Sequence, residues 1–264
     1  MNLIIEQGNT ATKLAIFDKG HLEKSFVYDI LNVQTLIHFF DTYSVSESIL
    51  STVIESDPEI ISFLRERCRE VIFLNESTSL PVKIQYQTPH TLGMDRLAAV
   101  VGANYLQPGK DILVIDAGTA ITYELLEASG IYVGGNISPG MNTRFKSLNL
   151  FTKKLPLIKE AEEIPLTGTT TETAIRAGVI YGICYEMDGY INELRVKYPN
   201  LFIFLTGGHS NYFAGRLKNR IFANINLVLV GLNRILEYNV ENKESSSSQP
   251  FCHHTDGNAC TKQH

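Results

Sequence analysis

The chain has 264 residues, of which 44% are hydrophobic and 19% charged, so it can form a packed core and is long enough for two domains. Its net charge of -5 argues against a nucleic-acid partner, which would require a basic face. No apolar run approaches the roughly 20 residues that span a bilayer, which excludes a membrane-spanning helix.

The N-terminus and the cysteines indicate where the protein works. The opening segment has no basic region followed by a long apolar stretch, so it does not resemble a signal peptide. The four cysteines have neither the pairing of a disulfide framework nor the spacing of a metal site. We therefore expect a reduced, cytoplasmic location.

The first part of the chain alternates short apolar runs with one helical pattern. Two runs around a tight polar turn predict a β-hairpin, and two further runs predict strands on either side of a helix. These segments are Leu3–Ile5 and Thr12–Phe17 for the hairpin, Ser46–Val53 and Val71–Leu74 for the strands, and Glu59–Arg69 for the helix. A second helix is predicted over Met94–Tyr105 and ends before Pro108-Gly109.

The second part of the chain repeats the same kinds of element. The run Ile112–Ile115 is typical of a fully buried strand, and further strands, a long helix, another strand and a last helix follow. The expected bounds are Thr122–Leu126, Ile131–Val133, Thr170–Leu194, Leu201–Leu205 and Asn226–Glu237. We predict domains at 1–108 and 109–240, followed by a polar, Ser-rich disordered tail at 241–264.

An internal echo is the most informative feature of the sequence. Glu6-Gln7-Gly8-Asn9-Thr10-Ala11-Thr12 follows the first predicted strand, and Asp116-Ala117-Gly118-Thr119-Ala120-Ile121-Thr122 follows the strand at 112–115. Both segments read acid, any residue, glycine, then small and mostly polar residues, about 110 residues apart. A repeat of this length predicts a duplicated domain rather than a solenoid.

The chemistry of the echo suits a nucleotide. A glycine after the strand lets the backbone approach a ligand closely, and successive N–H groups and hydroxyls can hold phosphate oxygens. A carboxylate beside them can bind Mg²⁺, directly or through water. The sequence contains neither the G-x-x-x-x-G-K-[ST] nor the G-x-G-x-x-G phosphate loop. If ATP binds, we therefore expect paired hairpins to hold it.

Six segments in order resemble the motifs of type III pantothenate kinases, and the resemblance runs from Met1 to about Glu237. They are EQGNTATK (Glu6–Lys13), TLGMDR (Thr91–Arg96), DAGTAIT (Asp116–Thr122), YVGGNISPG (Tyr132–Gly140), GTTTETAIRAG (Gly168–Gly178) and LTGG (Leu205–Gly208). The resemblance implies an α/β fold of two duplicated RNase H-like domains of the actin-like ATPase type, with an interdomain nucleotide cleft. It also implies a homodimer that uses ATP, Mg²⁺ and K⁺ or NH₄⁺ to phosphorylate pantothenate at the start of coenzyme A biosynthesis.

The same resemblance assigns the site residues. ATP contacts fall on Glu6, Gln7, Gly8, Asn9, Thr10, Ala11, Thr12, Lys13 and Thr119; substrate contacts fall on Tyr86, Gly93, Met94, Asp95, Arg96 and Thr171. Asp95 is implied as the general base and Asp116 as a monovalent-cation ligand. Glu6 stands where the family normally has an aspartate that assists Mg²⁺ binding, and its side chain is one methylene longer.

Each of these positions also has an ordinary structural interpretation. Asp95-Arg96 fits a helix N-terminal acid with a solvated neighbour, Tyr86 fits a buried strand residue, and Thr171 fits a helix N-cap region. Two rival functions remain at this level. One is another kinase or a phosphohydrolase of the same superfamily, and the other is a non-catalytic nucleotide-binding regulator.

Overall fold

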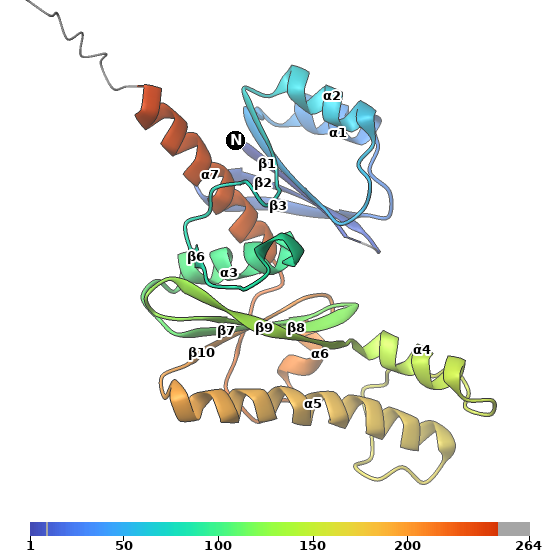
Figure 1. Ribbon diagram of the computed structural model, residues 1–264. Helices are drawn as coiled ribbons and strands as arrows, with labels where there is room; N and C mark the ends of the chain where they lie inside the picture. The colour runs from blue at the N-terminus through green and yellow to red at the C-terminus, as the bar shows by residue number, and fades with distance from the viewer. Residues whose placement is uncertain (9, 248–264) are drawn as a thin grey trace, which may run out of the picture.

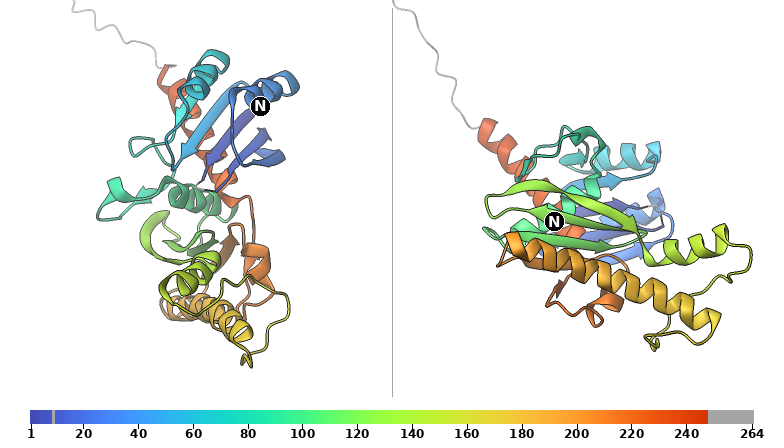
Figure 2. Two further views of the ribbon diagram at one scale, coloured as in Figure 1. Left: turned by 90° about the vertical axis from the view of Figure 1, so that its right-hand side faces the viewer. Right: turned by 60° about the horizontal axis from the view of Figure 1, so that its bottom comes forward.

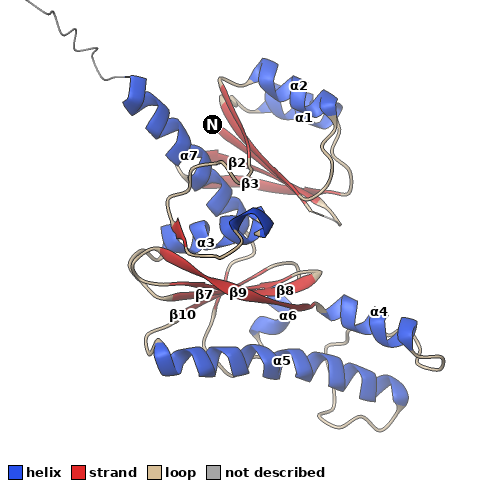
Figure 3. Cartoon of the chain, viewed as in Figure 1, coloured by secondary structure: helices blue, strands red, loops and turns tan. Residues whose placement is uncertain are grey.

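The computed structural model describes residues 1–8 and 10–247 and has two lobes, each built on one β-sheet (Figure 1). Among the described residues, no helix combines the length and the apolarity that crossing a bilayer requires. Figure 3 shows that helices cover the outer face of each sheet and that two further helices lie between the lobes.

The first lobe has a five-stranded sheet in the order β3-β2-β1-β4-β5. Its strands are β1 (Asn2–Gln7), β2 (Thr12–Asp18), β3 (His21–Tyr28), β4 (Glu47–Thr52) and β5 (Glu70–Phe73). The outer helices are α1 (Val33–Thr42) and α2 (Pro58–Arg67), and each begins at a side-chain cap. Asn32 accepts a hydrogen bond from Thr35 N, and Asp57 accepts one from Glu59 N.

The second lobe has a six-stranded sheet in the order β11-β10-β7-β8-β9-β6. Its strands are β6 (Lys83–Ile84), β7 (Ile112–Ala117), β8 (Ala120–Leu126), β9 (Ile131–Pro139), β10 (Phe202–Thr206) and β11 (Phe222–Ala223). The helices of this lobe are α4 (Met141–Phe151), α5 (Thr171–Lys197) and α6 (Ser210–Ala214), and the short 3-10 turn η1 (Pro89–Thr91) precedes α3.

The two sheets repeat one topology, which is the structural form of the echo in the sequence. In the first sheet β1 pairs antiparallel with β2 and parallel with β4. In the second sheet β7 pairs antiparallel with β8 and parallel with β10. The third strand of each set pairs antiparallel with the second, and the fifth pairs parallel with the fourth; β6 extends the second sheet beyond β9. Glu6 in β1 and Asp116 in β7 therefore hold equivalent positions.

Two helices fill the space between the sheets, as Figure 2 shows. They are α3 (Met94–Leu106) and α7 (Leu227–Ser247), which pack on each other and share one buried cluster with both sheets. Separate clusters lie beneath α1 and α2 on one side and beneath α4, α5 and α6 on the other. Each sheet is thus buried on both faces and needs the central helices to complete its core.

The crossing of α3 and α7 is a contact between backbones. A Cβ on Gly231 would overlap the carbonyl oxygen of Ala98, and a Cβ on Gly102 would overlap that of Leu227. Backbone atoms cannot rotate away as a flexible side chain can, so only glycine fits at these two positions. The close approach sets the distance between the two lobes.

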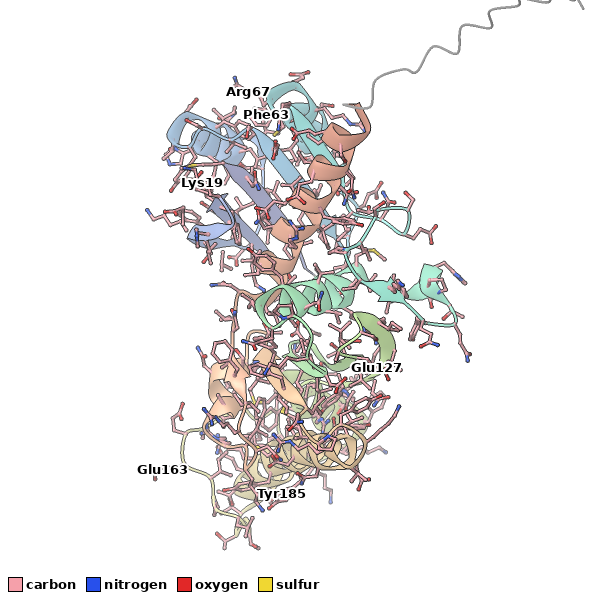
Figure 4. All side chains as sticks on the ribbon, turned by 90° about the vertical axis from the view of Figure 1, so that its left-hand side faces the viewer. Lys19, Phe63, Arg67, Glu127, Glu163 and Tyr185 are labelled. Atoms are coloured by element: carbon pink, nitrogen blue, oxygen red, sulfur yellow. The ribbon has the colours of Figure 1, made fainter. Side chains whose placement is uncertain are left out.

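Most of the predicted elements are present, and several more lie between them. The structure adds β3, α1, α4 and α6, which the sequence patterns did not predict. β3 joins β2 through Lys19-Gly20, where both residues have positive φ angles of 48° and 80°; Figure 4 labels Lys19 at the rim of the first lobe. The residues of β3 are mainly polar because β3 is an edge strand and most of its side chains are exposed.

The predicted division at 108/109 separates the two sheets, with two exceptions. β6 precedes the division but pairs with β9, and α7 follows it but packs on β1 and β4 of the first sheet. The predicted start of a tail at 241 is wrong for 241–247, which continue α7. Arg234 pairs with Glu241 across this point, and this extends the helix beyond the predicted end at Glu237. Residues 248–264 lie outside the described part of the chain.

The close crossing of α3 and α7 predicts that alanine at position 231 destabilises the protein. Gly231→Ala should destabilise the protein by about 1–3 kcal/mol, because the new methyl group overlaps fixed backbone. Gly189→Ala is the matched control, since Gly189 also lies inside a helix but a Cβ there meets nothing within 4 Å. That variant should gain about 0.5–1 kcal/mol from helix propensity. Urea unfolding checks both, and equal effects in the two variants would contradict the packing argument.

Candidate active site

A cleft with a volume of about 270 Å³ lies where the lobes meet the N-terminal end of α3. Its walls come from the ends of β1 and β4, from the first turn of α3 and from the β7–β8 hairpin. The lining residues are Glu6, Gln7, Gly8, Ser51, Val53, Asp95, Arg96, Asp116, Gly118, Thr119, Ala120 and Thr122. Segments that are far apart in the sequence thus contribute three carboxylates to one small space.

Strand alternation explains why the two hairpin acids face each other. Successive side chains along a strand point to opposite faces of its sheet. Glu6 shares a face with Ile4, and Asp116 shares a face with Val114; both apolar residues belong to the cluster between the sheets. Each acid therefore extends its strand's inward face at the point where the apolar layer ends and the cleft begins.

The two hairpin turns are held in equivalent ways. Gly8 N donates to Ala11 O at 3.0 Å, and Gly118 N donates to Ala120 O at the same distance. The second turn also packs against Gly140, where a Cβ would overlap Gly118 O. Backbone N–H groups and the Thr119 hydroxyl thus stand at a fixed edge of the cleft. Asn9, predicted to contact ATP, lies outside the described residues.

Glu6 and Lys13 form an ion pair across the first hairpin. They are direct neighbours in the β1–β2 register, and Lys13 Nζ lies 3.1 Å from Glu6 Oε2. Both side chains are mostly but not fully buried. Lys13 does not line the cleft itself, and its ammonium group partly neutralises the Glu6 carboxylate at the cleft edge. Of the other predicted contacts in this hairpin, Gln7 and Gly8 line the cleft, whereas Thr10, Ala11 and Thr12 do not.

Unlike Glu6, Asp116 has no cation paired with its carboxylate among the described residues. Its carboxylate forms no hydrogen bond or ion pair with the described residues. Its strand neighbour Thr206 is buried and has a hydroxyl oxygen without a partner. Gly207, with a φ of 90°, packs so closely that a Cβ there would overlap Asp116 Oδ1. Burial raises the pKa of Asp116 to about 7; nearby carboxylates add to this shift and Lys13 opposes it.

Asp95 occupies the first turn of α3, where the helix dipole favours a negative charge. Its Oδ1 accepts the backbone N–H of Arg96 at 2.8 Å, and the other oxygen remains available to the cleft. The preceding Gly93 leaves the room for this carboxylate, since a Cβ there would lie 2.5 Å from Oδ1. The GMDR motif therefore presents a carboxylate at a rigid helix start.

Arg96 reaches across to the second sheet and is 8% exposed. Its Nε and Nη2 donate to Oε1 and Oε2 of Glu124 at 2.6 and 2.8 Å, a bidentate pair. Tyr132 donates its hydroxyl to Glu124 Oε2 at 2.6 Å and accepts from Arg96 Nη2 at 3.1 Å. Glu124 and Tyr132 are both fully buried. Burial, with the adjacent Glu124 charge, raises the pKa of Tyr132 and keeps its hydroxyl protonated.

Tyr86 and Met94 lie beside the cleft rather than on its wall. The Tyr86 ring stacks on Tyr132 at 6.2 Å and lies 5.8 Å from Arg96 Cζ. Met94 lines a separate groove with Leu97 on another side of α3. Tyr86, a predicted substrate contact, thus lies near the cleft beside Arg96. Met94 lines a different groove, away from the three carboxylates.

Thr171 is the predicted site residue that the structure separates from the cleft. The N-cap of α5 is Thr170, whose hydroxyl accepts from Thr173 N at 3.2 Å. Thr171 follows it and lines a groove of about 710 Å³ between α4 and α5, together with Arg144 and Leu148. Within one chain, Thr171 does not share a surface with Asp95.

Sequence reasoning missed four residues of this region. Ser51 lies near the end of β4 and Val53 follows it; β4 is parallel to β1, and neighbouring parallel strands end at the same sheet edge. That adjacency is the signal that could have found them. Glu124 and Thr206 continue the inward faces of β8 and β10 at positions whose partners, Arg96 and Asp116, come from other segments. No local pattern marks them.

Comparison with known proteins gives one consistent answer. The family model described as type III pantothenate kinase matches residues 2–193. The type III pantothenate kinase of Phocaeicola vulgatus is 52% identical over 239 residues, which covers 90% of this chain and 99% of that protein. That of Porphyromonas gingivalis is 45% identical over 242 residues, covering 90% and 99%. The family resemblance predicted from the six motifs is confirmed.

Solved structures support the fold. The dehydratase activator of Clostridium difficile, determined with bound ADPNP, has a TM-score of 0.51 at 13% identity, covering 94% of this chain and 98% of its own. Glucokinase from an Antarctic psychrotroph has a TM-score of 0.51 at 13% identity, covering 90% and 98%. These likenesses, together with the repeated sheet topology, confirm the predicted duplicated α/β fold.

The raised pKa of Asp116 predicts a pH-dependent stability. An ordinary aspartate ionises near pH 3.9, whereas Asp116 does so at about 7. Ionisation therefore favours the unfolded chain, and this residue lowers stability progressively as the pH rises between those values. Asp116→Asn does not ionise, so its melting temperature relative to wild type should rise from pH 4 to pH 7.5 and then level off. Thermal unfolding across this range checks the trend.

Asp116→Ala provides the control for the Asp116 prediction. This variant also lacks the carboxylate but leaves a cavity, so its melting temperature should be lower than that of Asp116→Asn at every pH. Its difference from wild type should still follow the same pH trend. A difference from wild type that stays constant with pH in both variants would contradict the assignment.

Proposed function

Because the chain belongs to the type III pantothenate kinase family, we propose that it transfers the γ-phosphoryl group of ATP to pantothenate. The products are ADP and 4′-phosphopantothenate, and the reaction is the first step of coenzyme A biosynthesis. The observation that carries the proposal is the meeting of both hairpin turns with Asp95 in one cleft, in a chain matched to this family over most of its length.

The geometry supports in-line transfer to an alcohol. The acceptor hydroxyl oxygen attacks the γ-phosphorus while the bond to the β–γ bridging oxygen breaks and ADP leaves. A primary alcohol is scarcely ionised at neutral pH, and Asp95 is the carboxylate placed on a helix start to orient it and take its proton. Phosphoryl transfer depends mainly on positioning and charge stabilisation, so a strongly basic Asp95 is not required.

The first hairpin is suited to the phosphates of ATP. Gly8 exposes backbone at the cleft, and the ion pair with Lys13 reduces the negative charge that Glu6 would present to the phosphates. Across the cleft, Gly118 and Thr119 offer a second set of polar groups. Two such turns facing one another would clamp a nucleotide by its phosphates.

Mg²⁺ fits this arrangement as an ion carried mainly by the nucleotide. No group of three or more His, Cys, Asp or Glu side chains in 1–8 and 10–247 forms a metal cluster. Mg²⁺ commonly keeps several waters and binds one or two carboxylates plus substrate phosphates. Glu6 would be such a carboxylate, directly or through water, and the ion would neutralise charge that develops on the phosphates. The ion pair with Lys13 weakens Glu6 as a ligand.

The surroundings of Asp116 fit a large monovalent cation. The carboxylate has no partner among the described residues, and the Thr206 hydroxyl beside it is buried and unpaired. Oxygen atoms that have no hydrogen-bond partner, such as these, could bind K⁺ or NH₄⁺. A fixed cation here would hold Asp116 ionised and add positive charge near the phosphates.

A homodimer would give Thr171 the substrate contact that the family resemblance implies. Thr171 lines the α4–α5 groove and not the cleft of its own chain. It can contact pantothenate only if this groove meets the cleft of a second copy. Exposed apolar residues gather on the elements around the groove: Ile137, Leu150, Phe151, Leu157 and Leu166. A cytoplasmic location and the lack of a nucleic-acid partner remain predictions.

The first test is substrate dependence. The purified protein with Mg-ATP should release ADP only when pantothenate is added, and faster in K⁺ or NH₄⁺ than in Na⁺ buffer. A coupled ADP assay measures this, with glucose, acetate and water alone as competing acceptors. Release that is independent of pantothenate would move the function to another kinase or a phosphohydrolase. ATP binding without turnover of any acceptor would favour the regulator.

The second test concerns the proposed base. Asp95→Asn keeps the Oδ1 that accepts the Arg96 N–H, so the helix start and the melting temperature should be preserved. Turnover should fall by about 10²–10⁴-fold, because the amide cannot take the proton. The dissociation constant for ATP should change little, which calorimetry checks as the control for a correctly folded cleft. A kcat near that of wild type would contradict the assignment of Asp95 as the general base.

A further inference from the structure

The buried pair between Arg96 and Glu124 has a bidentate geometry that is rarely made for stability alone. Removing two charges from water is costly, and a well-packed apolar pair of similar volume often stabilises a core as well or better. Here Arg96 comes from the helix that carries Asp95, and Glu124 comes from the opposite lobe. The pair therefore joins the acceptor side of the cleft to the sheet that bears Asp116.

The surrounding backbone is shaped to admit this pair. A Cβ on Gly135 of β9 would lie 2.5 Å from Glu124 Oε2 and 2.9 Å from Arg96 Nη2. Tyr132 of the same strand satisfies both partners with one hydroxyl. The strand thus supplies space at one position and a hydrogen-bonding group at another, both directed at the same guanidinium.

The pairing also fixes the orientation of the Arg96 guanidinium. The hydrogen bonds to Glu124 and Tyr132 use Nε and Nη2, Tyr86 lies beside the same guanidinium, and the Arg96 side chain lines the cleft. No ion pair joins the Arg96 side chain to Asp95 or Asp116 in the described part of the chain. Glu124 therefore keeps the Arg96 guanidinium turned away from Asp95 and Asp116, the two cleft carboxylates that could otherwise pair with it.

We propose that Glu124, with Tyr132, is a positioning residue that holds Arg96 in the orientation that binds the acceptor. The inference rests on the proposed function, since the acceptor is taken to be pantothenate. Glu124 does not line the cleft and touches neither substrate, so it acts only through Arg96. The affinity for pantothenate, and not that for ATP, should depend on it.

The test is Glu124→Gln, which preserves shape but replaces one acceptor oxygen with an NH₂ group. In either orientation of the amide, one donor of Arg96 or Tyr132 then faces another donor. The KM for pantothenate should rise about tenfold or more, the scale of one lost charge-assisted hydrogen bond. The KM for ATP should stay within about twofold. A merely structural defect removes active molecules, which lowers kcat and leaves both KM values unchanged.

Two further variants complete the test. Asp188→Asn removes another buried carboxylate, one that accepts from Lys218 N and Asn219 N away from the cleft, and should change neither KM. Arg96→Ala should raise the KM for pantothenate by itself, and adding Glu124→Gln to it should cause no further rise if Glu124 acts through Arg96.

The outcomes separate the inference from the function. Wild-type activity with pantothenate, combined with an unchanged KM for pantothenate in folded Glu124→Gln, would overturn the positioning role alone. Additive effects with Arg96→Ala would do the same. If Glu124→Gln fails to fold, Tyr132→Phe decides: a KM for pantothenate raised about threefold supports the role, and an unchanged one refutes it. No pantothenate dependence in the wild type would instead overturn the proposed function and the acceptor named here.

Discussion

The backbone contact between α3 and α7 is the constraint on which the cleft depends. Glycines at 102 and 231 let the two helices approach until carbonyl oxygens take the place of side chains. Both sheets pack on this pair, so its thickness sets how far apart the two equivalent strand ends lie. The start of α3 carries Asp95 and Arg96 into the same gap. The separation of the three cleft carboxylates is therefore a consequence of helix packing and not of loop conformation.

Within that frame, the partly or fully buried carboxylates of the second lobe fall into two groups. Glu186 accepts from Tyr123 and Arg144, and Asp188 accepts from three N–H groups, so both are fully compensated. Asp116 is enclosed without a comparable set, and its pKa rises to about 7. An uncompensated acid beside an unpaired hydroxyl costs stability in the free protein. Such a cost is typical of a site prepared for a cation.

Local signals predicted the parts of this structure that local chemistry determines. Strand, acid and glycine in both halves were enough to predict a duplicated fold, because alternation and turn formation act over a few residues. The same reasoning could not find Glu124 or Thr206, whose partners lie 28 and about 90 residues away. The family resemblance put Thr171 with the substrate without locating it, because only tertiary packing places α5 beneath the second sheet. Edge elements such as β3 were missed because few of their residues are buried.

The two hairpins have diverged in a way that bears on their roles. In the strand register, Glu6 faces Lys13 whereas Asp116 faces Thr122. The longer glutamate therefore meets a cation across its own hairpin, while the shorter aspartate meets a hydroxyl and stays unpaired. A neutralised acid with an adjoining lysine repels phosphate less than a free carboxylate does. The unpaired acid in the same cleft has its pKa raised by burial to about 7, and a nearby positive charge would favour its ionised form. The duplication thus produces two equivalent positions, and one substituted neighbour leaves the first acid paired with a lysine and the second unpaired among the described residues.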